Sequence, residues 1–79
     1  MKEFTVKFAN TNDIVIFTKI ADEFEENIDV RSHDNHYVVD AKSIMGLFSL
    51  DLSKPVIVYT EDDKVARKFK ERVKKYVVY

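Results

Sequence analysis

The fold is decided by one stretch, Asp40-Ala41-Lys42-Ser43-Ile44-Met45-Gly46-Leu47-Phe48-Ser49-Leu50. It predicts the end of a strand, a hydroxyl residue and a short apolar helix. Ser43 suits the N-cap, because its side-chain oxygen can accept a hydrogen bond from a backbone N–H of the first turn. Helical spacing sets Ile44, Leu47 and Phe48 on one side and Met45 off that stripe. Because this segment is so apolar, we expect that it either packs against the rest of the domain or leaves part of itself exposed for a partner.

Strands are predicted at two places outside this stretch. Residues 2–9 alternate, so that one face carries Phe4, Val6 and Phe8. Residues 56–59 are apolar on both faces, which favours a central strand of a sheet. Pro55 stands at the start of this second strand, where its missing N–H does least damage.

A β-hairpin is predicted directly before the stretch. Residues 28–31 and 36–41 both alternate between apolar and polar side chains. The turn chemistry of His33-Asp34-Asn35 lies between them. We therefore expect two antiparallel strands joined near Asp34 and Asn35.

Two longer helices are predicted. The first covers residues 14–24, where Ile14, Phe17, Ile20, Ala21 and Phe24 recur at helical spacing after the capping cluster of residues 10–13. The second follows Thr60, its expected N-cap, with a buried stripe formed by Val65, Phe69 and Val73 and supported by Ala66 and Tyr76. The apolar tail of residues 77–79 either packs against the domain or extends this helix.

Composition limits the class of protein. The 79 residues predict a single domain, 1–79, and the net charge of −1 gives no general attraction to nucleic acid or a membrane surface. The sequence contains no cysteine, which fits a cytoplasmic location. It contains neither a signal peptide nor an apolar run of the roughly 20 residues that span a bilayer. The element order βαββαβα predicts an α+β fold with a mostly antiparallel four-stranded sheet covered on one face by helices.

The run Lys42-Ser43-Ile44-Met45-Gly46, with residues 47–50 after it, resembles the regulatory-serine segment of HPr. HPr is the histidine-containing phosphocarrier of the bacterial sugar phosphotransferase system. The predicted element order is also that of HPr, so the resemblance covers nearly the whole chain. It implies an HPr-like open-faced β-sandwich.

The active-site loop of the family is altered. In HPr a histidine before the first helix carries the phosphoryl group, within a signature that also holds glycine, arginine and proline. The corresponding residues here are Asn10, Thr11, Asn12 and Asp13, with none of these four residue types. Asp13 adds negative charge where a phosphate would be held by backbone N–H groups. The resemblance therefore does not carry phosphohistidine chemistry over to this loop.

Ser43 and its apolar neighbours match the family more closely. In the relatives with this motif, HPr kinase phosphorylates the matching serine, and the product binds the catabolite control transcription factor. The resemblance makes Ser43 a candidate phosphorylation site and Ile44, Met45, Leu47 and Phe48 a candidate partner-binding patch. A phosphate is tolerated at a helix N-terminus. The alternative is that Ser43 is only a cap, which contributes roughly 1 kcal/mol.

Other chemistry has little support in the sequence. His33 and His36 are the only histidines and lie in the predicted hairpin, where two imidazoles alone make a weak metal signal. We expect no metal site, no cofactor and no enzymatic activity, because no nucleophile–base pair, carboxylate dyad or glycine loop is recognisable. The basic residues 64–75 are expected to form a solvated helix face rather than a nucleic-acid site.

The leading hypothesis is an HPr-like regulatory or adaptor protein that binds proteins and carries no phosphohistidine. Its partners would be HPr kinase, the catabolite control transcription factor or phosphotransferase-system components. One alternative is a functional phosphocarrier that uses His33 or His36. Another is a generic protein-binding or dimerisation module on the HPr fold.

Overall fold

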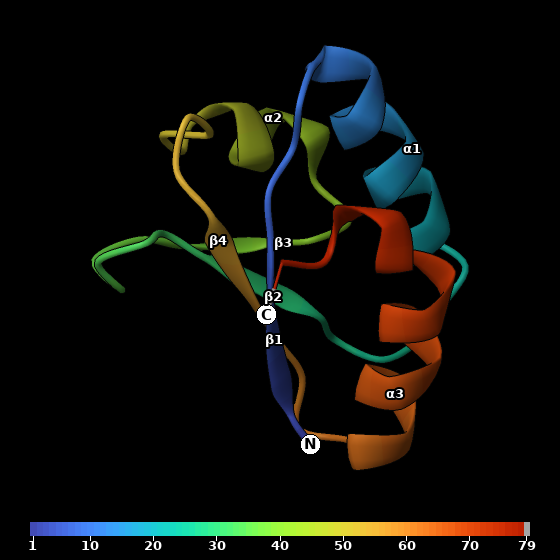
Figure 1. Ribbon diagram of the computed structural model, residues 1–79. Helices are drawn as coiled ribbons and strands as arrows, with labels where there is room; N and C mark the ends of the chain where they lie inside the picture. Colours follow the sequence, from blue (N-terminus) through green and yellow to red (C-terminus); the bar gives the residue numbers. More distant parts are fainter. Residues whose placement is uncertain (79) are drawn as a thin grey trace.

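A four-stranded sheet with the strand order β1-β4-β2-β3 forms one layer of the molecule (Figure 1). The computed structural model describes residues 1–78. The strands are β1 (Glu3–Val6), β2 (Asp29–Arg31), β3 (Val38–Asp40) and β4 (Val56–Tyr59). Each neighbouring pair is antiparallel, and β4 lies between β1 and β2, as its apolar sequence predicts.

The helices form the second layer, on one side of the sheet (Figure 1). They are α1 (Thr11–Ala21), α2 (Ile44–Phe48) and α3 (Asp63–Arg72), followed by the short 3-10 turn η1 (Lys74–Tyr76). α1 and α3 lie next to each other, and α2 contacts both α1 and β3. The predicted α+β class and the order βαββαβα are therefore confirmed.

A cluster of phenylalanines fills the space between the two layers. Phe69 of α3 lies at its centre, fully buried, with its ring centroid 5.1 Å from that of Phe17 on α1 and 6.1 Å from that of Phe4 on β1. Phe24 contacts Phe69 at 5.5 Å, and Phe8 contacts Phe17 at 5.1 Å. Edge-to-face contacts of this kind stabilise a core beyond the burial of apolar area alone.

The opposite face of the sheet is open and polar. The guanidinium of Arg31 lies 4.2 Å from the ring centroid of Tyr59, which is a cation–π distance. The Tyr59 hydroxyl donates to the carboxylate of Glu61, and this hydrogen bond raises the pKa of Tyr59. The single-sided burial gives the open-faced arrangement predicted from the sequence.

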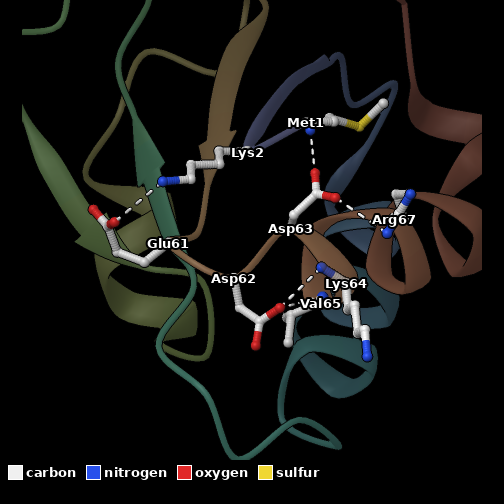
Figure 2. Close-up of polar contacts among 8 residues, drawn as sticks. All are labelled: Met1, Lys2, Glu61, Asp62, Asp63, Lys64, Val65 and Arg67. Carbon is white, nitrogen blue, oxygen red and sulfur yellow. Dashed lines mark hydrogen bonds and ion pairs between the residues drawn. The ribbon is translucent and has the colours of Figure 1, made fainter.

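The predicted N-cap of the last helix was wrong. Asp62 caps α3, because its Oδ1 accepts from the backbone N–H of Lys64 at 2.9 Å and lies 3.4 Å from that of Val65 (Figure 2). Thr60 is instead buried, and its hydroxyl donates to the carbonyl of Asn27 at 2.9 Å. Asp63 accepts from the Met1 ammonium and pairs with Arg67, which is one turn along α3 (Figure 2).

The first helix is displaced toward the N-terminus relative to its predicted span of 14–24. It begins at Thr11 because Asn10 is the N-cap, and it ends at Ala21. Phe24 still packs against the core from the turn that follows. The apolar stripe therefore located the buried face correctly and the helix ends incorrectly.

The apolar tail packs alongside the outer edge of β1 instead of extending α3. Val77 forms a bridge with Val6, and the N–H of Val78 donates to the Thr5 carbonyl at 2.9 Å. The N–H of Lys7 also donates to the Tyr76 carbonyl at 2.9 Å. Tyr79, the last residue of the predicted tail, lies outside the described residues.

Replacing the central phenylalanine tests the core. We expect Phe69→Ala to lower the free energy of unfolding by about 3–5 kcal/mol, since it leaves a cavity among three aromatic rings. Urea denaturation followed by circular dichroism measures the change. Phe48→Ala is the matched control, because Phe48 is 46% exposed. An equal loss in both variants would contradict the proposed centre of the core.

An ion pair that joins α3 to the end of α1 predicts a pH dependence. Both terminal nitrogens of Arg72 donate hydrogen bonds to the Glu23 carboxylate, at 2.8 and 3.1 Å. This hydrogen bonding lowers the pKa of Glu23 below its ordinary 4.5. The stabilisation is therefore present above pH 4.5 and is lost as the pH falls through the lowered value. Glu23→Gln should lower stability at neutral pH but not in acid.

Denaturation midpoints measured from neutral to acidic pH check this expectation. Glu25→Gln is the control, since Glu25 is exposed and has no ion pair among residues 1–78. A Glu23→Gln effect that stays constant with pH would show that the side chain acts through packing and not through its charge.

Candidate functional site

The short helix α2 is held by a cap at its beginning. Ser43 has an extended backbone, with φ −101° and ψ 105°, and its Oγ accepts from the N–H of Gly46 at 3.0 Å. A Cβ added at Gly46 would lie 3.1 Å from both the Ser43 Oγ and the Val39 Cβ. The predicted N-cap is confirmed, and the approach of Gly46 to β3 leaves little room for a larger residue.

The apolar residues of α2 divide between the core and the solvent. Leu47 is fully buried and Ile44 is partly buried against the core. Met45 is 80% exposed and Phe48 is 46% exposed. Of the three residues that helical spacing set on one side, Ile44 and Leu47 pack against the core, whereas Phe48 is nearly half exposed, so the segment is partly exposed rather than wholly packed down.

The beginning of α1 is closed by its own side chains. The Asn10 Oδ1 accepts from the N–H of Asp13 at 3.0 Å. In return, the Asp13 Oδ2 accepts from the N–H of Ala9 at 2.9 Å. This is a variant of the reciprocal capping box, with the carboxylate bonded one residue before the N-cap. A negative charge is thus fixed at the end of the helix that attracts anions.

A hollow of about 330 Å³ brings α1 and α2 together. Its lining comes from the loop before α1, from α1 itself, from α2 and from the loop after α2: Phe8, Ala9, Asn10, Thr11, Ile14, Phe48, Leu50 and Leu52. Two parts of the predicted site, the Asn10–Thr11 loop and Phe48, therefore share one surface. Asn12, Asp13, Ile44, Met45 and Leu47 are not part of this lining.

Sequence reasoning missed the far wall of this hollow. Leu50 and Leu52 are not among the candidate site residues that the sequence predicts. The signal was two leucines separated by one exposed acid, Asp51. The Asp51 carboxylate turns to Ser53, whose hydroxyl donates at 2.6 Å and whose N–H donates at 3.1 Å. These bonds lower the pKa of Asp51.

Both histidines lie in the connection between β2 and β3. Their side chains are exposed, and the His36 Nδ1 lies 3.4 Å from a carboxylate oxygen of Asp34. The Ser32 hydroxyl and the His36 N–H both donate to Asp34, and together they lower the pKa of that carboxyl. In Figure 1 this hairpin lies at the left edge of the view, away from the beginning of α1 at the top.

Known structures resemble this chain over almost its whole length. The phosphocarrier protein HPr from Bacillus anthracis str. Ames is 27% identical, with a TM-score of 0.74 over 98% of this chain and 94% of that one. The fold is HPr-like. HPr-C-His from Thermoanaerobacter tengcongensis is 29% identical, with a TM-score of 0.72 over 92% and 90% of the two chains. No protein-family model and no curated protein matches the sequence.

Membrane-spanning helices and metal-binding clusters are both absent from residues 1–78. The helices there are too short or too polar to cross a membrane. Within the same residues, no cluster of three or more histidine, aspartate or glutamate side chains is arranged to hold a metal ion.

Two substitutions of Ser43 test whether its side chain caps α2. Ser43→Ala removes the acceptor for the Gly46 N–H and should lower the free energy of unfolding by about 1 kcal/mol. Ser43→Asp keeps a capping carboxylate and should stay within about 0.5 kcal/mol of the parent. Thermal and urea denaturation of the two variants measure this. If Ser43→Asp were the less stable variant, the carboxylate would not be capping α2.

Proposed function

We propose that this chain is an HPr-like regulatory or adaptor protein related to the sugar phosphotransferase system. It binds proteins through the hollow between α1 and α2 and does not carry a phosphohistidine. The similarity to structures described as HPr phosphocarrier proteins supports the link to that system. We place it in the cytoplasm with its partners and assign it no enzymatic activity of its own.

The observation that carries the proposal is the closed beginning of α1. A phosphate held there would need backbone N–H groups and a positive environment. The Asp13 carboxylate instead accepts from the Ala9 N–H, and Asn10 already caps the helix. A phosphate dianion at this position would meet a fixed like charge, which disfavours it. His33 and His36 belong to a different loop, which supports the same conclusion.

The docking surface combines the hollow with the exposed part of α2. Phe48 contributes an aromatic side chain that is nearly half exposed at the hollow, and Met45 on the same helix is almost fully exposed. Aromatic and methionine side chains are enriched where proteins bind one another. The Asn10–Thr11 loop borders the same hollow with polar groups, so a partner would meet an apolar centre and a polar rim.

Ser43 supplies a regulatory switch on this surface. Its side chain is partly exposed and stands at the beginning of α2, next to Ile44 and Met45. A phosphate on Ser43 would add charge beside the docking surface without placing it at the negative end of the helix. Modification would therefore change partner binding while the domain stays folded.

Transfer from phosphoenolpyruvate tests the first half of the proposal. Incubation with enzyme I and phosphoenolpyruvate should give no acid-labile phosphoprotein, whereas an HPr with its histidine run in parallel should be labelled. Labelling of this chain would refute the loss of carrier activity. Mapping the label to His33 or His36 would then establish that the chain is a carrier with a relocated histidine.

HPr kinase with ATP tests the second half. We expect the mass to increase by one phosphate group in the parent chain and not in Ser43→Ala. Unmodified parent protein would remove the kinase switch from the proposal.

A surface substitution tests the docking surface independently of phosphorylation. Met45→Lys should reduce recovery of the partner from extracts of the source cells by about tenfold, because it places a charge in an apolar contact. Val78→Lys is the control, since Val78 is also exposed but lies beside β1. Equal recovery with the parent and Met45→Lys would place partner binding elsewhere on the molecule.

A further inference from the structure

The two edges of the sheet differ in how they are covered. The edge at β1 is paired with the tail through Val77 and Val78. At the other edge, β3 pairs with β2 on one side, and no strand within residues 1–78 pairs with its other side. An unpaired edge presents free main-chain donors and acceptors, so β3 is the place where another strand can join this sheet.

Hydrogen bonds at the two ends of the β2–β3 pair fix which backbone groups face this edge. The N–H of Ser32 donates to the Tyr37 carbonyl at 2.9 Å, and the N–H of Ala41 donates to the Ile28 carbonyl at 2.8 Å. In an antiparallel pair, hydrogen-bonded and non-hydrogen-bonded positions alternate. Every second residue between Tyr37 and Ala41 therefore directs its main chain away from β2.

Those residues are Val38 and Asp40, which lie opposite Arg31 and Asp29 in the register of the sheet. The N–H and carbonyl of Val38 and the N–H of Asp40 point toward the free edge. The Asp40 carbonyl is already used, since it accepts from the N–H of Ser43 at 3.0 Å. Two apolar side chains along the same edge are open to solvent, with Tyr37 66% and Val38 54% exposed.

We propose that β3 pairs with β3 of a second copy of this chain. The strands run antiparallel about a two-fold axis at Val38, so that each Val38 donates to and accepts from Val38 of the other copy. This register sets Tyr37 opposite Val39 and His36 opposite Asp40. The two four-stranded sheets become one, and each exposed valine and tyrosine of the edge gains an apolar neighbour.

Charge complementarity favours a second copy over an unrelated strand. Asp29 and Asp40 are directly opposite each other on β2 and β3, where like charges are unfavourable. Neither acid forms an ion pair within the described part of the chain. In the proposed register, His36 of the second copy lies opposite Asp40 and offers an imidazole to this acidic pair. The two-fold axis makes the same contact twice.

The pairing is expected to be weak. It involves residues 36–40 of each copy, far less surface than the roughly 1,600 Å² of a standard interface. Sedimentation equilibrium and pulsed-field-gradient diffusion should therefore be carried out on the full chain up to about 1 mM. We expect reversible, concentration-dependent dimers, together with slowed hydrogen exchange of the Val38 amide at high concentration.

A pair of valine-to-lysine substitutions locates the interface. Val38→Lys places two ammonium groups opposite each other at the axis and should raise the dissociation constant by at least about tenfold. Val78→Lys introduces the same change at a residue that is 47% exposed at the opposite edge, and should leave the dissociation constant unchanged. Equal effects of the two variants, or none from Val38→Lys, would overturn the proposal.

Substitutions at His36 test the register. His36→Lys should strengthen the dimer and His36→Asp should weaken it, each on the order of tenfold, because His36 faces Asp40 of the other copy twice per dimer. His36 also lies 3.4 Å from Asp34 of its own copy, so urea denaturation of both variants at low protein concentration separates a change in the single copy from a change in the dimer. Changes in the same direction would exclude this register, and a chain that stays monomeric at about 1 mM would exclude the dimer.

Discussion

The structure depends on burying only one face of a small sheet, and the ring of Phe69 lies at the centre of the aromatic contacts that cover it. Phe69 contacts side chains from β1, from α1 and from the turn after α1, so it joins both layers of the fold. A chain of 79 residues has little apolar surface to bury, which makes each aromatic contact a large part of its stability.

The candidate site is a consequence of the same packing. α1 is fixed against α3 by the aromatic cluster, and α2 is fixed by Leu47 and by the approach of Gly46 to β3. These two anchors bring the beginning of α1 to one side of a hollow and Phe48 to the other. Local caps at Asn10 and Ser43 then decide which polar groups face a partner.

Patterns that depend on neighbouring residues predicted most of the fold. Alternation located β1, β2 and β3, a continuous apolar run located β4, and the stripe containing Phe69 located the buried face of α3. The Ser43 cap was predicted because a cap needs only its own first turn. Long-range contacts were not predictable in this way. Thr60 has the sequence context of an N-cap but is buried, with its hydroxyl donating to the Asn27 carbonyl. Leu52 lines the hollow only because the fold brings it close to the beginning of α1.

The bridge between Val6 and Val77 connects almost the two ends of the chain. The outer edge of β1 can therefore pair only after residues far later in the sequence have been synthesised, and its other neighbour, β4, is also distant in sequence. Early local pieces such as the β2–β3 hairpin can form while the remainder is still being translated, but the sheet cannot. Closure of the sheet is therefore dominated by contacts of long sequence separation, which slow folding.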